Sequence, residues 1–141
     1  MEKLSLDSSV AIKWFSKEKD SDKALNVLNA YVDGKIVLIT SHLLFYEVAN
    51  ALRYKPDLTI ENVKKAIQAL FKLHMKVVDL NDKIMIKSTE IAYQDDVTVY
   101  DAIPVAIAET EEAVCITADE KTQYNKLKEK HPIILLKEYK V

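Results

Sequence analysis

Four acidic residues lie in apolar surroundings, where a surface carboxylate is not expected. Asp7 follows the first apolar segment, in LSLDSSV, and Asp119 follows the apolar run in VCITAD. Glu47 lies within LLFYEVANAL and Asp101 within VYDAIPVAIA, and neither has a charged residue close by in the chain. Burying a carboxylate costs several kcal/mol unless another group pairs with it. These four positions are therefore the first candidates for chemistry.

Together, four converging carboxylates would favour a bound cation. Their mutual repulsion would raise their pKa values and oppose folding, and a divalent ion would remove that repulsion. A site with oxygen ligands only, without His or Cys, selects a hard ion, Mg²⁺ or Mn²⁺. Such ions polarise phosphate groups, activate water and stabilise a leaving oxygen. The residue types thus predict a metal-dependent enzyme acting on phosphate esters, with the substrate left undefined.

Each acid also has a structural interpretation. Asp7 could cap a helix that begins near Ser8 or Ser9, and Asp119 could cap a helix over 120–130, because Asp is a preferred N-cap residue. Glu47 fits this interpretation least, since neither a capping role nor a charged partner is evident for it.

The Asp101 segment contains a conflict of local signals. Thr98 and Asp101 match the spacing of a capping box, which would start the helix at Thr98. Pro104 would then remove a hydrogen bond inside that helix. A cap nearer Asp101 suits Pro104 better, and we expect the helix to start there.

Strand-like and helix-like segments alternate along the chain, which is typical of an α/β sandwich around a mostly parallel sheet. Leu25, Leu28 and Val32 recur at helical spacing before Gly34, and Thr59 is a candidate N-cap for the helix at 59–74. In such sheets ligands bind beyond the carboxyl ends of the strands. We expect strands at 3–7, 36–40, 76–80, 113–117 and 133–136, and helices after Asp7 and at 20–33, 41–54, 59–74, 82–94, 99–112 and 119–130.

Composition excludes several other classes of protein. The chain of 141 residues has one glycine, Gly34, so no glycine-rich phosphate loop and no GxSxG nucleophile motif is present. The single cysteine, Cys115, cannot form an internal disulfide and is expected to be buried. A formal charge of −2 provides no global basic field for nucleic acid. No signal peptide or membrane anchor is evident, and we expect one domain, 1–141, in the cytoplasm.

Four motifs in this order resemble the PIN-domain family and, within it, the VapC-type toxins of toxin–antitoxin pairs. The opening LDSSVAIKWF supplies Asp7 with Ser8 and Ser9, and FYEVANAL supplies Glu47 with Asn50 three residues later. VYDAIPVAIAE carries Asp101, and ITADEK carries Thr117 two residues before Asp119. Each motif alone is weak, but the four together cover essentially the whole chain. Pro104 departs from the family, where an aromatic or aliphatic residue is more usual.

The resemblance implies a three-layer α/β/α sandwich with a central, mostly parallel five-stranded sheet. It also implies an endoribonuclease that depends on Mg²⁺ or Mn²⁺, acts as a homodimer and is held inactive by a small antitoxin. Asp7, Asp101 and Asp119 would be the metal ligands, and Glu47 would hold and help to deprotonate the attacking water. Ser8, Ser9, Asn50 and Thr117 would donate hydrogen bonds that orient the carboxylates.

Two other functions remain open at this stage. A PIN-like domain could instead bind RNA or a partner protein, with weak cleavage or none. A phosphatase or receiver-like domain that uses Asp7 as a nucleophile is less favoured, because LSLDSSV lacks the DxD pattern of such phosphatases. Lysines at 121, 126, 128 and 130 either follow an RNA backbone or form a solvated helix surface.

Overall fold

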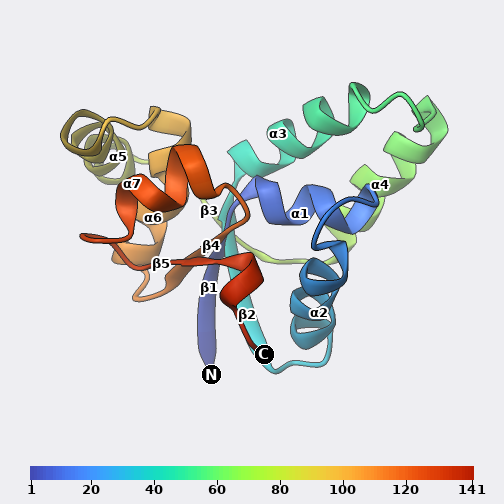
Figure 1. Cartoon of the computed structure of the whole chain (residues 1–141), viewed down its shortest axis with the longest axis horizontal. Coiled ribbons are helices and arrows are strands. Elements are labelled where there is room, and N and C mark those ends of the chain that lie inside the picture. The colour runs from blue at the N-terminus through green and yellow to red at the C-terminus, as the bar shows by residue number, and fades with distance from the viewer.

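The computed structural model describes residues 1–141 and contains one five-stranded sheet (Figure 1). The strand order is β3-β2-β1-β4-β5, and every neighbouring pair is parallel. The expected mostly parallel sheet is therefore confirmed and is parallel throughout. The strands are β1 (Glu2–Leu6), β2 (Ile36–Ser41), β3 (Lys76–Val78), β4 (Val114–Thr117) and β5 (Ile133–Leu135).

Helices cover both faces of the sheet, which confirms the three-layer α/β/α architecture (Figure 1). One layer contains α1 (Ser8–Phe15), α2 (Ser21–Val32), α3 (His42–Arg53) and α4 (Ile60–Lys72). The opposite layer contains α5 (Asp82–Asp95), α6 (Val99–Thr110) and α7 (Asn125–Leu127), with the π-helix η1 (Glu120–Tyr124) before α7. The 3₁₀ turn η2 (Leu136–Glu138), after β5, packs on the α1–α4 side through Leu136. No helix combines the length and the apolar character that crossing a membrane requires.

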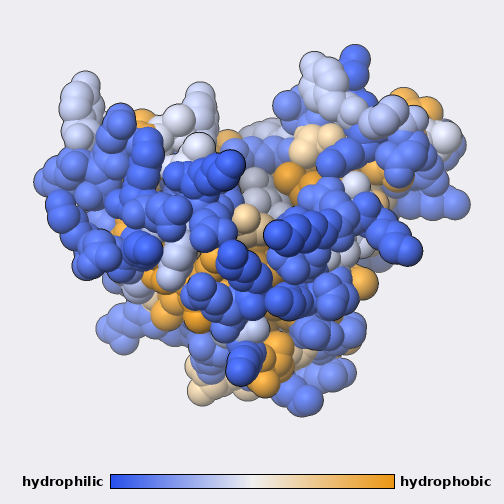
Figure 2. All heavy atoms as spheres, viewed as in Figure 1, coloured by the Kyte–Doolittle hydropathy of each residue, from blue (hydrophilic) through white to orange (hydrophobic).

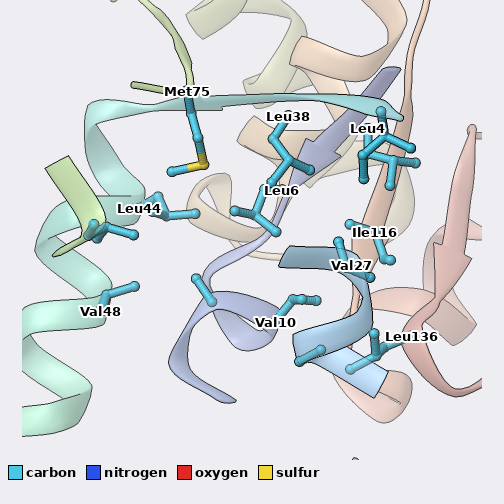
Figure 3. Packing of buried hydrophobic residues seen from close by; sticks show 14 of the residues in the cluster. Leu4, Leu6, Val10, Val27, Leu38, Leu44, Val48, Met75, Ile116 and Leu136 are labelled. Carbon is cyan, nitrogen blue, oxygen red and sulfur yellow. The ribbon is translucent and has the colours of Figure 1, made fainter. Parts of the chain in front are cut away.

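The strands divide their side chains between two separate apolar cores. Leu4 and Leu6 of β1 pack with the α1–α4 layer, where Figure 3 shows them beside Val10 and Val27. Cys115 of β4 points to the other core, formed with α5, α6 and α7, and is buried and free as expected. This alternation follows from the two-residue period of a strand. Both faces of the sheet are therefore covered by apolar side chains, and the polar groups of the site lie at the strand ends.

The buried face of α2 differs from the one that the leucine spacing predicts. Leu25 is 40% exposed and Val32 is 65% exposed, whereas Ala24, Val27 and Ala30 are buried. The residues Ala24, Val27 and Ala30 are spaced by three, so they share one face of α2, and this face packs against the core. By contrast, Thr59 caps α4 as predicted, in a capping box with Asn62.

The helix that carries Asp101 begins at Val99, in agreement with the expected range 99–112, but its N-cap is not where Pro104 suggested. Thr98 is its N-cap and accepts a hydrogen bond from the Asp101 N–H at 3.0 Å, so the expected cap nearer Asp101 is wrong. The helix runs through Pro104 without a break. Pro104 is buried in α6, and its carbonyl accepts a 2.6 Å hydrogen bond from the buried Ser5 hydroxyl of β1. Packing and this bond offset the backbone bond that the proline lacks.

The expected helix at 119–130 is shorter and starts as a π turn. Asp119 precedes the turn, its side chain accepts from the Thr122 N–H, and the Tyr124 N–H donates to the Asp119 carbonyl at 2.9 Å. That last bond closes an i→i+5 ring, one residue wider than an α-helical ring. Regular α-helix follows only over Asn125–Leu127.

Candidate active site

The sheet topology brings the first and fourth acids to one edge. After β1 the chain builds β2 and β3 on one side, and it later adds β4 and β5 on the other, so the order reverses between β1 and β4. Ligand sites of parallel α/β sheets form at such a point, beyond the carboxyl ends. Asp7 directly follows β1 and Asp119 lies two residues after β4. Figure 2 shows the molecule hollowed between its α5–α7 part and its α3–α4 part on this side.

Asp7 is the most buried of the four acids, with 7% of its surface exposed. It caps α1 by accepting from the Ser9 N–H at 3.1 Å. Asp7 is therefore both the N-cap of α1 and a member of the group of acids. The Ser9 hydroxyl donates to the same carboxylate oxygen at 2.5 Å. Burial raises the pKa of Asp7, and the Asp119 charge adds to that rise, while the hydrogen bonds from Ser9 and Gln123 oppose it.

Thr117 and Ser9 tie the end of β4 to Asp7. The fully buried Thr117 hydroxyl accepts from the Asp119 N–H at 3.0 Å and lies 3.2 Å from the Ser9 hydroxyl. Ser9 in turn accepts from the Ala118 N–H at 2.9 Å. The Asp119 carboxylate caps η1 by accepting a hydrogen bond from the Thr122 N–H at 3.0 Å, and it also accepts one from the Thr122 hydroxyl. Both strand-end acids are thus held by neighbouring hydroxyl and amide groups.

Glu47 extends from α3 toward the same edge and is half-buried. It lines a small depression with Asp7, Ser8 and Pro104. The pKa of Glu47 is raised to about 7, mainly by burial and also by the charges of Asp7 and Asp101, while a hydrogen bond from Ser8 acts in the opposite direction. A carboxyl group that titrates near neutral pH suits a general base.

Asp101 lies in the first turn of α6 and is also half-buried. Burial raises its pKa to about 6, with further contributions from Asp7 and Asp119. A hydrogen bond from the Thr98 side chain and the charge of Lys126 act in the opposite direction. The four acids therefore share one electrostatic environment, although they come from four separate segments of the chain.

Among the accompanying polar residues, one differs in position from the others. Ser8, Ser9 and Thr117 lie beside the acids, through the contacts given above. Asn50 lies on the exposed surface of α3, and its side chain makes no hydrogen bond within the chain. The structure thus gathers Asp7, Glu47, Asp101 and Asp119 with the three hydroxyl residues and leaves Asn50 apart.

Gln123 is a site residue that the sequence reasoning missed. Its side chain is fully buried and contacts Asp7, Thr117 and the Asp101 backbone. The segment 119–130 contains many charged residues, and this pattern predicts a solvated helix. It therefore gives no indication that the Gln123 side chain is buried. One signal was available, since Gln123 follows Asp119 by four residues and such pairs share a helix face.

The donor set fits a hydrated hard cation better than a closed metal cage. No three His, Cys, Asp or Glu side chains lie close enough, as they stand, to hold one ion together. Mg²⁺ is usually held by one or two carboxylates and keeps several waters, so it does not need such a cage. Buried carboxylates with raised pKa values and only oxygen donors are the chemistry that a divalent cation stabilises.

A larger cleft adjoins the acids and contains two lysines. It has a volume of about 410 Å³ and is lined by Ser9, Lys13, Tyr54, Lys55 and Asp119, among others. Lys13 and Lys55 both pair with Glu18, at 3.3 Å and 3.0 Å. Two cations against one carboxylate leave a local positive charge beside a group of acids. Such a cleft can accommodate part of a nucleotide chain.

Solved structures with this fold come from several toxin–antitoxin systems. A toxin–antitoxin complex from Klebsiella pneumoniae is similar over 100% of both chains, with TM-score 0.71 and 16% identity. VapBC2 from Rickettsia felis, bound to a promoter DNA fragment, matches over 96% of this chain and 97% of that one, with TM-score 0.68 and 16% identity. Mycobacterium tuberculosis VapC20, described as a toxin that cleaves the sarcin–ricin loop, matches over 88% and 95%, with TM-score 0.68 and 12% identity.

These identities establish similarity of fold. Comparison with curated proteins gives no significant match. The family model of the PIN domain matches residues 4–129, which include all four acids, most of β1 and all of β2, β3 and β4. The chain therefore belongs to the PIN domain family.

Proposed function

We propose that this protein is a metal-dependent endoribonuclease that hydrolyses RNA phosphodiester bonds, and that it is the toxin of a VapBC-type toxin–antitoxin pair. The observation that carries the proposal is a group of four carboxylates at the carboxyl ends of β1 and β4 whose charges repel one another. The named toxins of the same fold support the second part. RNA, a cognate antitoxin and a second copy of the chain would be its partners.

In this proposal Asp7, Asp101 and Asp119 would hold Mg²⁺ or Mn²⁺, directly or through water. The ion would supply positive charge to polarise the phosphate and to stabilise the leaving oxygen. The Ser9 hydroxyl orients the Asp7 carboxylate directly, and the Thr117 hydroxyl donates to Gln123, whose amide also contacts that carboxylate. Asn50, from its exposed position on α3, would contribute only after a side-chain rearrangement.

Glu47 would act on the attacking water. Its pKa of about 7 lets the carboxylate accept a proton at neutral pH, and its half-buried position leaves it open to solvent. In-line attack of water on the phosphate would leave a 5′-phosphate and a 3′-hydroxyl. Lys13 and Lys55, in the adjoining cleft, would contact the RNA backbone on one side of the scissile bond.

The test measures cleavage of RNA by the purified protein with Mg²⁺, with Mn²⁺ and with EDTA, and identifies the product ends. Asp7→Asn and Asp101→Asn are the site variants, and Asp33→Asn, at an exposed position after α2, is the matched control. We expect metal-dependent cleavage by the wild type and the control only. Cleavage in EDTA, full activity of both site variants, or 2′,3′-cyclic products would reject the mechanism.

A second function is binding of RNA or a partner protein without efficient cleavage. The cleft with Lys13 and Lys55 beside Asp119 favours it, because such a cleft could hold a nucleotide chain without cleaving it. Absence of cleavage for every RNA tried, together with RNA binding that is insensitive to EDTA, would favour this function over the nuclease.

A further inference from the structure

Gln123 connects the three segments that carry the aspartates. Its amide nitrogen donates to Asp7 Oδ1 at 3.3 Å and to the Asp101 carbonyl at 2.9 Å. Its amide oxygen accepts from the Thr117 hydroxyl, two residues before Asp119, at 2.5 Å. The side chain has no exposed surface, so water cannot replace these bonds. All polar atoms of this buried amide that can bond do so within the site.

The direction of the Gln123 amide is fixed by its partners. The Thr117 oxygen already accepts from the Asp119 N–H at 3.0 Å, so its single proton is available for the Gln123 oxygen. The other two partners, a carboxylate oxygen and a backbone carbonyl, can only accept. Rotating the amide by half a turn would place its oxygen against both acceptors. Gln123 therefore presents two N–H groups toward Asp7 and the first turn of α6.

The neutral side chain of Gln123 suits a site whose negative charge would be balanced by a bound cation. A lysine at this position would neutralise Asp7 from within, and a glutamate would add to the repulsion among the acids. A neutral amide supports the ionised form of Asp7 by hydrogen bonding and leaves the net charge of the site unchanged. The residue lies in the π turn η1, and turns of this type are frequent at functional sites.

We propose that Gln123 is a positioning residue, which fixes the Asp7 carboxylate relative to Asp101 and thereby sets the affinity of the site for its divalent cation. This inference rests on the proposed metal-dependent function. It assigns Gln123 no contact with RNA or with the attacking water. Loss of the amide should therefore change metal binding and leave RNA binding unchanged.

The test is calorimetric titration of the purified full chain with Mn²⁺. Gln123→Met removes the amide at nearly constant volume, and Gln68→Met, on the exposed surface of α4, is the matched control. We expect Gln123→Met to weaken Mn²⁺ binding about tenfold or more, as for other residues that orient metal ligands, with the number of ions bound per chain unchanged. Cleavage should recover as Mn²⁺ is raised, with an unchanged KM for RNA. Gln68→Met should behave as the wild type.

A merely structural role gives a different result. It would lower the fraction of competent protein, and so the number of ions bound, with the Kd of each remaining site unchanged. That outcome overturns the inference. Gln123→Asn provides a second variant if the methionine variant does not fold, because it keeps a buried amide but is too short to span its partners; it too should weaken Mn²⁺ binding, and an unchanged Kd would overturn the proposal.

The same titration separates this inference from the proposed function. Wild-type protein that binds Mn²⁺ but cleaves no RNA would count against the ribonuclease, and the comparison of Kd values would still decide the role of Gln123. Equal Kd values in an active wild type and an active Gln123→Met variant would reject the positioning role alone. Absence of Mn²⁺ binding by the wild type would overturn both.

Discussion

The molecule contains two groups of carboxylates that differ in what neutralises them. In the first, the His131 cluster, the two ring nitrogens of His131 lie 2.5 Å from Glu109 and 2.8 Å from Asp95. Lys87 pairs with Glu109 at 3.2 Å and Lys130 with Asp95 at 3.5 Å. The hydrogen bond from His131 is the main cause that holds the pKa of Asp95 below its usual range.

The second group, the candidate active site, has no such partners. None of the ion pairs of the chain involves Asp7, Glu47, Asp101 or Asp119, although the chain has 20 basic residues. Burial, together with repulsion from the neighbouring acids, raises the pKa values of Asp7, Glu47 and Asp101. The difference indicates that the His131 cluster stabilises the fold, whereas the repulsion among the acids of the candidate active site opposes it.

The largest effect is expected for Asp101→Asn, which tests the difference between the two groups of carboxylates. Without the Asp101 charge the site should lose a metal ligand, and cleavage should fall by more than about a hundredfold. The metal-free protein should be at least as stable as the wild type, because one repelling charge is gone. Cleavage rates and denaturant unfolding in EDTA check both effects. A variant that is both active and less stable would contradict the assignment.

Asp95→Asn should show the opposite pair of effects. The Asp95 side chain is 5% exposed and pairs with His131 and Lys130. Its replacement by a neutral amide would leave these two basic groups without their carboxylate partner. We expect a loss of about 1–3 kcal/mol in the free energy of unfolding, with Mn²⁺ affinity unchanged. Denaturant unfolding and calorimetry give the two values. A weakened metal site in this variant would mean that the clusters are not independent.

The distinction between the two groups could be predicted only in part from the sequence. Acids in apolar segments pointed to Asp7, Glu47, Asp101 and Asp119, because burial without a nearby cation is costly. The strand and helix pattern likewise predicted the layers and the parallel sheet. The His131 cluster joins α5, α6 and the segment before β5, and such long-range pairing leaves no local signal.

Two further features of the backbone, the turn after Asp119 and the N-cap of α6, could not be predicted from residue patterns. The π turn after Asp119 turns Gln123 into the core, whereas a regular helix pattern predicted a solvated surface. The N-cap of α6 at Thr98 places Pro104 inside the helix, where burial and the hydrogen bond from the Ser5 hydroxyl to the Pro104 carbonyl make it acceptable. In both cases tertiary contacts outweigh the local preference.

The pH dependence of stability should separate the two groups next. Glu47 and Asp101 have raised pKa values in the folded protein, about 7 and about 6, so the stability that they contribute is present at low pH and is lost as pH rises through those values. After allowance for solvent screening, we expect a loss of about 1–2 kcal/mol between about pH 5 and pH 8 in EDTA. Asp95, with a lowered pKa, acts oppositely and loses its contribution as pH falls. Unfolding curves in EDTA measure this slope, and Asp101→Asn should reduce it.

The addition of Mg²⁺ provides the control for this prediction. A cation that binds the ionised carboxylates should stabilise the protein more at high pH than at low pH. Equal stabilisation at both ends of the range would show that the ion binds elsewhere.

The smallest effect is expected at the Glu18 pairs, an intermediate case with two lysines for one acid. Lys55→Ala removes one cation from the cleft beside Asp119 and should raise the KM for RNA about threefold, with kcat little changed. The salt dependence of RNA binding should weaken in parallel. Lys64→Ala, at an exposed position of α4, is the control. An unchanged KM would remove this cleft from the RNA path.

A crystal structure with bound Mn²⁺ tests the central claim most directly. Anomalous scattering locates the ion without reference to the protein coordinates. We predict a peak among the carboxylates of Asp7, Asp101 and Asp119, and none at the His131 cluster. Absence of a peak at these aspartates at saturating Mn²⁺, or an ion bound at another place in the molecule, would contradict the account.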